Sequence, residues 1–462
     1  MKIKICGINS VETAMAAVQG EVDYLGLIFA PHSPRRVTLT QAMSIASTVR
    51  TRTHAVALVA VFKDNPLDEI RAVVAQLKPD VVQLHGVYAA ELARALHDCG
   101  CQIWCDARAT DEGDMLLVDS PQPGSGMHAD WSRAKQLTTV GKCVVLAGGL
   151  GVDNLRAAMH TGATILDINS TLEDVPGHKS VAKITQLLQY FHTLQHGNRI
   201  EQLFAECRMN GRKVFAAFMP IGFPTLALSE RAVATMLENG AGIIEFGVPC
   251  AEPTADGAVI RDADRLAIEN GTTLDDVLQC IKRLRQRFPA TPFVLFSYFA
   301  SIQQYGVEQF AESAAAAGVD AVLVVDAPAG ECAVLQQVLR THSLTMIPLL
   351  PPNVSPNEIA QLTAGAEDSF IYAINFAGTT GERKFLPKEL PAHLDALRGH
   401  TTMPILAGFG ISTPEQAAIL AEHADGFVVG SALVKILLEY PDDHGLTRLA
   451  SLCTQFGGVG FL

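Results

Sequence analysis

Short apolar runs recur along the first part of the chain, and stretches with the spacing of amphipathic helices separate them. Eight runs rich in β-branched residues lie at 2–6, 23–29, 56–62, 80–86, 102–107, 115–120, 143–149 and 164–170. Helix-like stretches such as ETAMAAVQG and NLRAAMHTG lie between them. Near-continuous apolar strands that alternate with helices predict an α/β fold with a parallel sheet.

The second part of the chain repeats this pattern. Its eight apolar runs lie at 214–222, 242–249, 292–299, 320–328, 345–352, 370–378, 403–410 and 426–432. Eight strands, each followed by a helix, are what a (β/α)8 barrel requires. We therefore predict an α/β protein of two tandem (β/α)8 TIM barrels, residues 1–196 and 199–462, joined by a short polar linker around 192–202. A doubly wound sheet is the competing architecture, which a count of strands does not exclude.

Composition narrows the class of protein. Of 462 residues, 48% are hydrophobic and 18% charged, which excludes a disordered chain and a small disulfide scaffold. Because no apolar run reaches about 18 residues and the N-terminus lacks a signal-peptide pattern, we expect a cytoplasmic protein with no membrane partner. A net charge of −13 argues against nucleic acid as a partner. Residues 1–198 carry 17 basic and 19 acidic side chains, and residues 199–462 carry 18 and 29, as expected of two separately evolved units.

The ten cysteines include no paired Cys-x-x-Cys motif and no His or Cys pair at zinc spacing. We interpret them as reduced, mostly buried thiols, and we expect neither a metal nor a cofactor.

The ends of the two parts resemble each other. Residues 144–170 and 404–431 both contain a strand, a glycine pair, a helix, a second strand and a small hydroxyl residue. In a barrel these would be strands seven and eight, after which backbone N–H groups can bind a phosphate. Ordinary tight turns are the alternative. We expect both parts to bind phosphorylated small molecules, and the candidate groups are Gly148, Gly149, Gly408, Gly410, Gly430 and Ser431.

Residues 2–195 resemble phosphoribosylanthranilate isomerase. The resemblance rests on KICG (4–7), GLIFAPHSPRRV (26–37), DVVQLHG (80–86), LLVDS (116–120), LAGGLGVDN (146–154) and LDINSTLEDVPGHK (166–179). It implies an Amadori rearrangement of N-(5-phosphoribosyl)anthranilate to the open-chain carboxyphenylamino-deoxyribulose phosphate.

The resemblance implies Asp119 as the acid that opens the sugar ring and Cys6 as the base that removes the C2′ proton. A thiol serves as a base if a positive neighbourhood lowers its pKa, and a proton-donating carboxyl needs a pKa raised by burial. Arg35 would bind phosphate, and Asp167 and Ser170 are further candidates for the substrate site. As alternatives, Cys6 is a buried hydrophobe, Asp119 a loop cap, and Asp167 an orienting group for the last loop.

Two segments depart from the isomerase pattern. The stretch 126–131 differs from the Gly-Lys-Thr/Arg-Phe-Asp-Trp of many relatives, and Cys105 and Asp106 replace a Lys-Ala pair. Losing a lysine and gaining an acid should weaken binding of an anionic substrate, so we expect an active but altered isomerase.

Residues 199–440 resemble the tryptophan synthase α subunit. The resemblance rests on the motifs IEFGVPCAEPTADG (244–257), GVDAVLVVDAP (318–328), IPLLPPN (347–353), AGTTGERK (377–384), AGFGIS (407–412) and VVGSALVKI (428–436). The resemblance implies retro-aldol cleavage of indole-3-glycerol phosphate to indole and glyceraldehyde 3-phosphate. It also implies a β subunit as partner.

In this resemblance Glu245 is the general acid/base, Asp256 stabilises positive charge at the indole nitrogen, and Tyr372 lies near Glu245. The alternative for Glu245 is a salt-bridged core acid, although a buried carboxyl without a role is costly. The phosphate would be held by Gly381, Gly410, Gly430 and Ser431.

This part also departs from its family, at Glu252, Ala300 and Phe376, in regions linked to loop closure or contact with β. We expect an intact retro-aldol site with altered coupling to β. Two alternatives remain open for this part: a β-independent indole lyase, and a module that mainly binds and activates β. Other phosphosugar barrels, such as the histidine-pathway isomerases, lack both sets of motifs.

Overall fold

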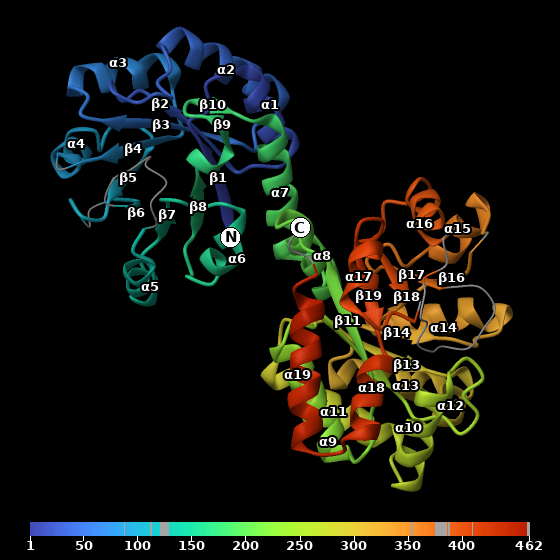
Figure 1. Ribbon diagram of the computed structural model, residues 1–462. Coiled ribbons are helices and arrows are strands. Elements are labelled where there is room, and N and C mark those ends of the chain that lie inside the picture. Colours follow the sequence, from blue (N-terminus) through green and yellow to red (C-terminus); the bar gives the residue numbers. More distant parts are fainter. Residues whose placement is uncertain are drawn as a thin grey trace. The chain divides into compact units, whose positions relative to one another are not determined.

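The computed structural model describes residues 1–86, 88–110, 113–120, 129–352, 354–374, 386, 389–408 and 410–459. The chain divides into two compact units, Met1–Gln195 and His196–Leu462, in which strands alternate with helices (Figure 1). Among the described helices, none combines the length and apolar character that a membrane crossing needs.

Eight parallel strands of the first unit form a closed barrel in their order along the chain. They are β1 (Lys2–Cys6), β2 (Tyr24–Ile28), β3 (Ala57–Lys63), β4 (Val81–His85), β5 (Gln102–Asp106), β6 (Met115–Val118), β7 (Val144–Leu146) and β8 (Ile165–Ile168). The ring closes where β1 pairs with β8, which sets Lys4 opposite Asp167. All eight predicted strands of this part are present.

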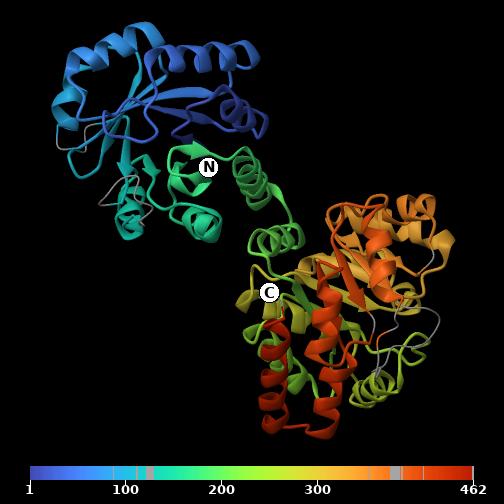
Figure 2. The ribbon, with the colours of Figure 1, turned by 45° about the horizontal axis from the view of Figure 1, so that its top comes forward.

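Helices surround this barrel (Figure 2). They are α1 (Val11–Gln19), α2 (Leu39–Arg52), α3 (Leu67–Leu77), α4 (Ala89–Ala95), α5 (Trp131–Thr139), α6 (Val152–Met159) and α7 (Val181–His196). A 3-10 turn, η1 (Ser170–Leu172), and a hairpin of β9 (Glu173–Val175) and β10 (His178–Lys179) follow β8. The described residues that link β5 to β6 form turns and bends where the pattern predicted a helix, because the link is too short for one.

The barrel interior follows from the two-residue period of its strands. Alternate side chains point inward, and those of Tyr24, Val59, Val81, Trp104 and Leu117 pack together there. The rings of Tyr24 and Trp104 meet edge to face with centroids 5.1 Å apart. This apolar layer closes the barrel below its carboxyl-terminal mouth, so only the mouth is left for polar chemistry.

The described strands of the second unit form one nine-stranded parallel sheet. The strands are β11 (Val214–Pro220), β12 (Ile243–Gly247), β13 (Phe293–Ser297), β14 (Ala321–Val324), β15 (Thr345–Met346), β16 (Leu349–Leu350), β17 (Ile371–Ile374), β18 (Ile405–Gly408) and β19 (Gly426–Val429). The end strands β15 and β16 belong to one segment, in which Pro348 cannot donate to a ladder. Since β15 pairs with β14 and β16 with β17, the sheet returns on itself there.

These features confirm the predicted fold class of two (β/α)8 units. The helices of the second unit are α8 (Arg199–Met209), α9 (Leu226–Glu238), α10 (Ala258–Glu269), α11 (Leu274–Arg287), α12 (Phe299–Tyr305), α13 (Val307–Ala317), α14 (Ala329–Thr341), α15 (Pro356–Thr363), α16 (Leu390–Arg398), α17 (Pro414–Ala421), α18 (Ser431–Glu439) and α19 (Asp443–Gly457).

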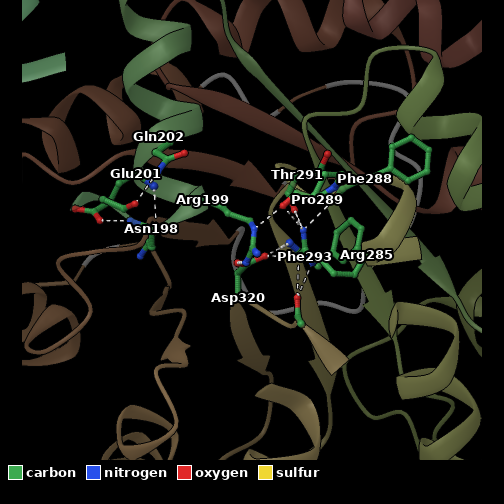
Figure 3. A network of polar contacts seen from close by, with 12 residues as sticks. Asn198, Arg199, Glu201, Gln202, Arg285, Phe288, Pro289, Thr291, Phe293 and Asp320 are labelled. Atoms are coloured by element: carbon green, nitrogen blue, oxygen red, sulfur yellow. Dashed lines mark hydrogen bonds and ion pairs between the residues drawn. The ribbon is translucent and has the colours of Figure 1, made fainter. Parts of the chain in front are cut away.

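A network of polar contacts secures the amino-terminal ends of β13 and β14 (Figure 3). Asp320 pairs with Arg199 and with Arg285, each at 2.7 Å, and accepts the Phe293 N–H at 2.7 Å. The Arg285 guanidinium lies 3.9 Å from the Phe293 ring centroid. This end of a (β/α)8 barrel serves stability, so the network fixes α8 and α11 to the sheet and leaves the opposite end for the site.

Candidate active sites

A cavity of about 600 Å³ opens at the carboxyl-terminal ends of the strands of the first unit. Cys6, the last residue of β1, and Asp119, which follows β6, both line it. Arg35, Asp167 and Ser170 line it as well. The structure therefore brings together the residues that the sequence placed far apart.

Cys6 sits beside a buried ion pair. Lys4, on the same face of β1, is fully buried, and its Nζ lies 2.7 Å from Asp167 Oδ2 on β8. Burial raises the pKa of the Cys6 thiol above its ordinary value, although Lys4 acts to lower it. The expected cation is thus present, but it does not lower the pKa of Cys6 below its ordinary range in the ligand-free protein.

Asp119 is held against the next residue. Its Oδ1 accepts the Ser120 N–H at 2.6 Å. Burial raises the pKa of Asp119 to about 6, against the lowering effect of that hydrogen bond. A carboxyl with this pKa is partly protonated near neutral pH, as a proton donor requires.

Arg35 is held by an acid. Its Nε and Nη2 donate to Glu173 Oε1 and Oε2 at 2.6 and 3.0 Å, and Lys179 Nζ donates to Oε1 at 2.7 Å. Burial would raise the pKa of Glu173, but Arg35 and Lys179 outweigh it and hold the pKa at about 2. Glu173 therefore anchors the β9–β10 hairpin to the rim of the cavity.

Two glycines follow β7 in the left-handed region. Gly148 has φ +83° and Gly149 φ +63°, a conformation that favours glycine. Both line the cavity, as does Ser170 at the start of η1. The backbone after β7 and β8 thus faces the space where we expect phosphate.

The departure at the end of β5 is compensated within the chain. Arg108 donates through Nε and Nη2 to the two oxygens of the buried Asp106, at 2.9 and 2.6 Å, and through Nη1 to Ser120 O at 3.2 Å. Asp106 therefore does not present an unpaired negative charge to the substrate. The differing residues 126–128 lie outside the described residues.

In the second unit Glu245 is buried in the middle of β12, with 1% of its surface exposed. Neither carboxyl oxygen has a hydrogen-bond partner among the described residues. Burial raises the pKa of Glu245 to about 8. The alternative of a salt-bridged core acid is therefore wrong for the described part of the chain.

Asp256 follows β12 in the loop that leads to α10, and it is buried. Its Oδ2 accepts the Tyr298 hydroxyl at 2.7 Å, and the same hydroxyl accepts the Ala255 N–H at 3.1 Å. Asp264 on α10 is also buried, and burial together with the charge of Asp256 raises its pKa to about 8.

The remaining predicted residues of this unit lie on β17 and around β18 and β19. Tyr372 is on β17, and burial and then Glu245 raise the pKa of its hydroxyl. A β-carbon at Gly408 would lie 2.2 Å from Tyr372 Cε1, so glycine gives the ring its space. Gly410 has φ +68°, and Gly430 is the N-cap of α18, which Ser431 begins.

Four further positions that the sequence singled out are less informative. Gly381 and Phe376 lie outside the described residues, so the structure says nothing of them. Glu252 and Ala300 are exposed, which leaves both side chains accessible from outside the unit.

Sequence reasoning gave no role to Lys4, Gln83, His85, Glu173 or Tyr298. The period-two spacing of Lys4 with Cys6, and of Gln83 with His85, is a usable signal, because residues two apart on a strand share a face. Glu173 carried no such signal, since its partner Arg35 lies 138 residues away in the chain. In the part of the chain that the structure describes, no group of three or more His, Cys, Asp or Glu side chains could hold a metal ion.

The fold and the two sites define an enzyme with acid–base chemistry at the carboxyl-terminal ends of two (β/α)8 barrels. A family model of N-(5′-phosphoribosyl)anthranilate (PRA) isomerase matches residues 3–190, and a model of the tryptophan synthase alpha chain matches residues 204–456. The chain belongs to the tryptophan synthase alpha chain family and carries an isomerase domain before it.

Known proteins support this assignment. The tryptophan synthase alpha chain of Geobacter sp. (strain M21) is 41% identical over 261 residues, which are 56% of this chain and 94% of the relative. That of Xylella fastidiosa (strain 9a5c) is 36% identical over 253 residues, 55% and 94% of the two chains.

Solved structures resemble this chain too. Mycobacterium tuberculosis tryptophan synthase has a TM-score of 0.52 at 31% identity and covers 58% of this chain and 100% of its own. The Legionella pneumophila tryptophan synthase alpha chain has a TM-score of 0.52 at 29% identity, with coverages of 57% and 97%. The protein is thus a bifunctional enzyme of tryptophan biosynthesis, an isomerase and a lyase that acts on indole-3-glycerol phosphate.

Proposed function

We propose that residues 1–196 isomerise N-(5-phosphoribosyl)anthranilate with Asp119 as general acid and Cys6 as general base. This proposal rests on the observation that both side chains line one cavity at the carboxyl-terminal ends of the strands. Asp119 gives a proton to the ring oxygen as the C1′–O bond breaks, which leaves an iminium at C1′. The Cys6 thiolate then removes the C2′ proton to give an enolamine. Protonation of C1′ and loss of the C2′ hydroxyl proton give the ketone.

The base requires a thiolate, and Lys4 is the group that favours it. Its ammonium is buried beside Cys6 and is held in place by Asp167. In this proposal Asp167 keeps Lys4 charged and oriented, and its role is positional. The phosphate lies against Gly148, Gly149 and Ser170, with Arg35 at the rim.

We propose that residues 199–462 cleave indole-3-glycerol phosphate with Glu245 as the acid that becomes the base. The carrying observation is a buried carboxyl whose pKa is raised to about 8 and whose oxygens lack partners in the described part of the chain. Glu245 gives its proton to indole C3. The carboxylate then takes the proton of the glycerol hydroxyl as the C–C bond breaks, so that indole and an aldehyde leave.

Asp256 stabilises the positive charge that C3 protonation creates at the indole nitrogen. The Tyr298 hydroxyl donates to Asp256 Oδ2, and a hydrogen bond to a carboxylate favours its ionised form. Tyr372 packs beside Glu245. The N–H groups at the start of α18, after Gly430, have no partner within the helix and suit a phosphate, with Ser431, Gly410 and Gly381 beside them.

A tryptophan synthase β subunit completes the proposal as the partner that receives indole. The proposal includes altered coupling to β, because Glu252 and Ala300 are exposed departures from the family pattern. Both reactions would run in the cytoplasm, which the ten free cysteines support.

The test measures indole release from indole-3-glycerol phosphate by the purified chain, with and without a bacterial β subunit. Slow release alone with strong stimulation by β supports an alpha subunit that still couples to β. Fast release that β leaves unchanged supports a β-independent lyase, and stimulation equal to that of an ordinary alpha chain contradicts the altered coupling. Absence of release under both conditions contradicts the role of this barrel as a lyase. In parallel, loss of anthranilate-ring fluorescence on phosphoribosylanthranilate conversion reports the isomerase.

A further inference from the structure

Gln83 and His85 face the isomerase cavity from β4, and the proposed mechanism gives them no task. They lie two residues apart on the strand, so both side chains point into the barrel. Gln83 is 1% exposed, and the His85 side chain is 10% exposed. Both line the cavity that holds Cys6 and Asp119.

The contact between these two side chains favours one tautomer of His85. Gln83 Nε2 donates to His85 Nε2 at 2.8 Å. With the amide nitrogen as the donor, His85 Nε2 accepts and is the unprotonated nitrogen. The single proton of the neutral ring is therefore on Nδ1.

The surroundings keep His85 neutral. Burial, together with the cations Lys4 on β1, Lys63 on β3 and Arg108 after β5, lowers the pKa of His85 to about 4. Asp106 at the end of β5 acts in the opposite direction without reversing the shift. At the pH of the reaction His85 therefore offers a hydrogen-bond donor without a positive charge.

The Nδ1 nitrogen lies next to the proposed general acid. His85 Nδ1 lies 4.0 Å from Asp119 Oδ2 and has no hydrogen-bond partner among the described residues. The other carboxyl oxygen, Oδ1, already accepts the Ser120 N–H. Catalytic hydrogen bonds are often long in ligand-free proteins and tighten in the complex.

We infer that His85 is a positioning residue for Asp119, oriented by Gln83, and that its Nδ1–H donates to Asp119 Oδ2 once Asp119 has given its proton to the ring oxygen. No covalent bond to His85 forms or breaks. The contact stabilises the ionised form of Asp119 relative to its protonated form. It therefore lowers the pKa of Asp119 and makes this residue a stronger proton donor. The inference rests on the proposed role of Asp119.

Three variants test it in the full chain. His85→Ala removes the donor. His85→Asn keeps an N–H close to the place of Nδ1, and His85→Gln moves it toward the place of Nε2. We expect His85→Ala to lower the isomerase kcat roughly 10-fold with little change in KM. The pH profile of kcat/KM for the unaltered chain should bend near pH 6. In His85→Ala this bend should move up by roughly one pH unit.

His85→Asn should restore most of kcat and return the bend toward pH 6, whereas His85→Gln should behave like His85→Ala. Equal losses in the Ala and Asn variants with an unmoved bend would overturn the inference, because that result describes packing alone. A raised KM with an unmoved bend would also overturn it, since His85 would then bind substrate. Both tryptophans, Trp104 and Trp131, lie in the first unit, so their fluorescence checks that each variant is folded.

The unaltered chain and Asp119→Asn separate this inference from the proposed function. Full isomerase activity in Asp119→Asn contradicts the acid role itself. Loss of activity there, together with wild-type behaviour of His85→Ala, contradicts only the role of His85.

Discussion

A β-carbon added at Gly148 would lie 2.9 Å from Asp119 Oδ1 and 2.7 Å from Ser120 N. The chain after β7 therefore passes close to the carboxyl group of Asp119, the proposed general acid. The φ of +83° at Gly148 disfavours any residue other than glycine there. Gly148→Ala must displace Asp119 as well as strain the backbone. We expect the isomerase kcat/KM to fall at least roughly 100-fold, measured by the loss of anthranilate fluorescence.

Gly141→Ala is the matched control for this change. Gly141 has φ +80°, and nothing lies within 4 Å of the added β-carbon. It should cost about 1 kcal/mol of unfolding free energy through backbone strain, with an unchanged kcat/KM. Equal losses of activity in the two variants would show that strain alone, and not the position of Asp119, is responsible.

The isomerase should show a bell-shaped pH dependence in which the active form is a minor species. The reaction needs Asp119 protonated and Cys6 ionised, but the pKa of Asp119 is about 6 and that of Cys6 is raised by burial. Below pH 6 the rate should rise with pH as thiolate forms. Above pH 6 the gain in thiolate and the loss of protonated Asp119 cancel, which gives a plateau up to the pKa of Cys6. A profile of kcat/KM without a bend near pH 6 would contradict these assignments.

Glu173 should stabilise the first unit in a pH-dependent way. Its folded-state pKa is about 2, below the ordinary value of 4.5, so its contribution is complete above pH 4.5 and is lost as the pH falls toward 2. Glu173→Gln should lower the unfolding free energy at pH 7 by roughly 2 to 3 kcal/mol, since one pKa unit is worth about 1.4 kcal/mol. The difference from the unaltered chain should shrink below pH 4.5, as measured by urea unfolding with tryptophan fluorescence.

Glu69→Gln provides the comparison for Glu173. Glu69 pairs with Arg36 at 3.5 Å, and the two side chains are 37% and 49% exposed. Exposed pairs contribute about 0 to 1 kcal/mol, so this variant should unfold close to the unaltered chain. If Glu173→Gln were equally mild at pH 7, the Arg35–Glu173–Lys179 contacts would not hold the hairpin.

The buried Glu245 carboxyl, which the lyase reaction requires, should lower the unfolding free energy of the second unit. Its folded-state pKa of about 8 exceeds the ordinary 4.5, so ionisation opposes folding as the pH rises from 4.5 to 8. Glu245→Gln should abolish indole release and stabilise the second unit by a few kcal/mol at pH 8, with a smaller gain at pH 5. Far-UV circular dichroism during urea unfolding measures this, and the tryptophan signal marks the transition of the first unit. An active or less stable variant would contradict the assignment.

The barrels were predictable because apolar runs and helical spacing depend on local sequence. Each of the sixteen predicted strand runs contains described strand residues, and the motifs around Cys6, Asp119 and Glu245 marked the candidate sites. The turns and bends of the described residues between β5 and β6 were not predicted, because a short link does not show in a count of strands. Pro348 interrupts its strand because proline has no N–H to donate to a ladder, which is a local property. The pairing of β15 with β14 and of β16 with β17 depends on other parts of the chain.

The partners of the site residues were harder to predict, because they come from distant parts of the chain. Asp167 lies 163 residues from Lys4, and Glu173 lies 138 residues from Arg35. The acid gained at Asp106 led to an expectation of weaker binding, which ignored its neutralisation by Arg108 two residues on. Burial, and with it the raised pKa of Cys6, also follows from the packed barrel rather than from the motif.

The central claim is that two independent acid–base sites in one chain carry the two reactions. The most direct measurement assays isomerase and indole release on the same preparations of the unaltered chain, Asp119→Asn and Glu245→Gln. We predict that Asp119→Asn loses the isomerase and keeps indole release, and that Glu245→Gln does the reverse. Loss of both activities in either variant, or of neither, would contradict the claim.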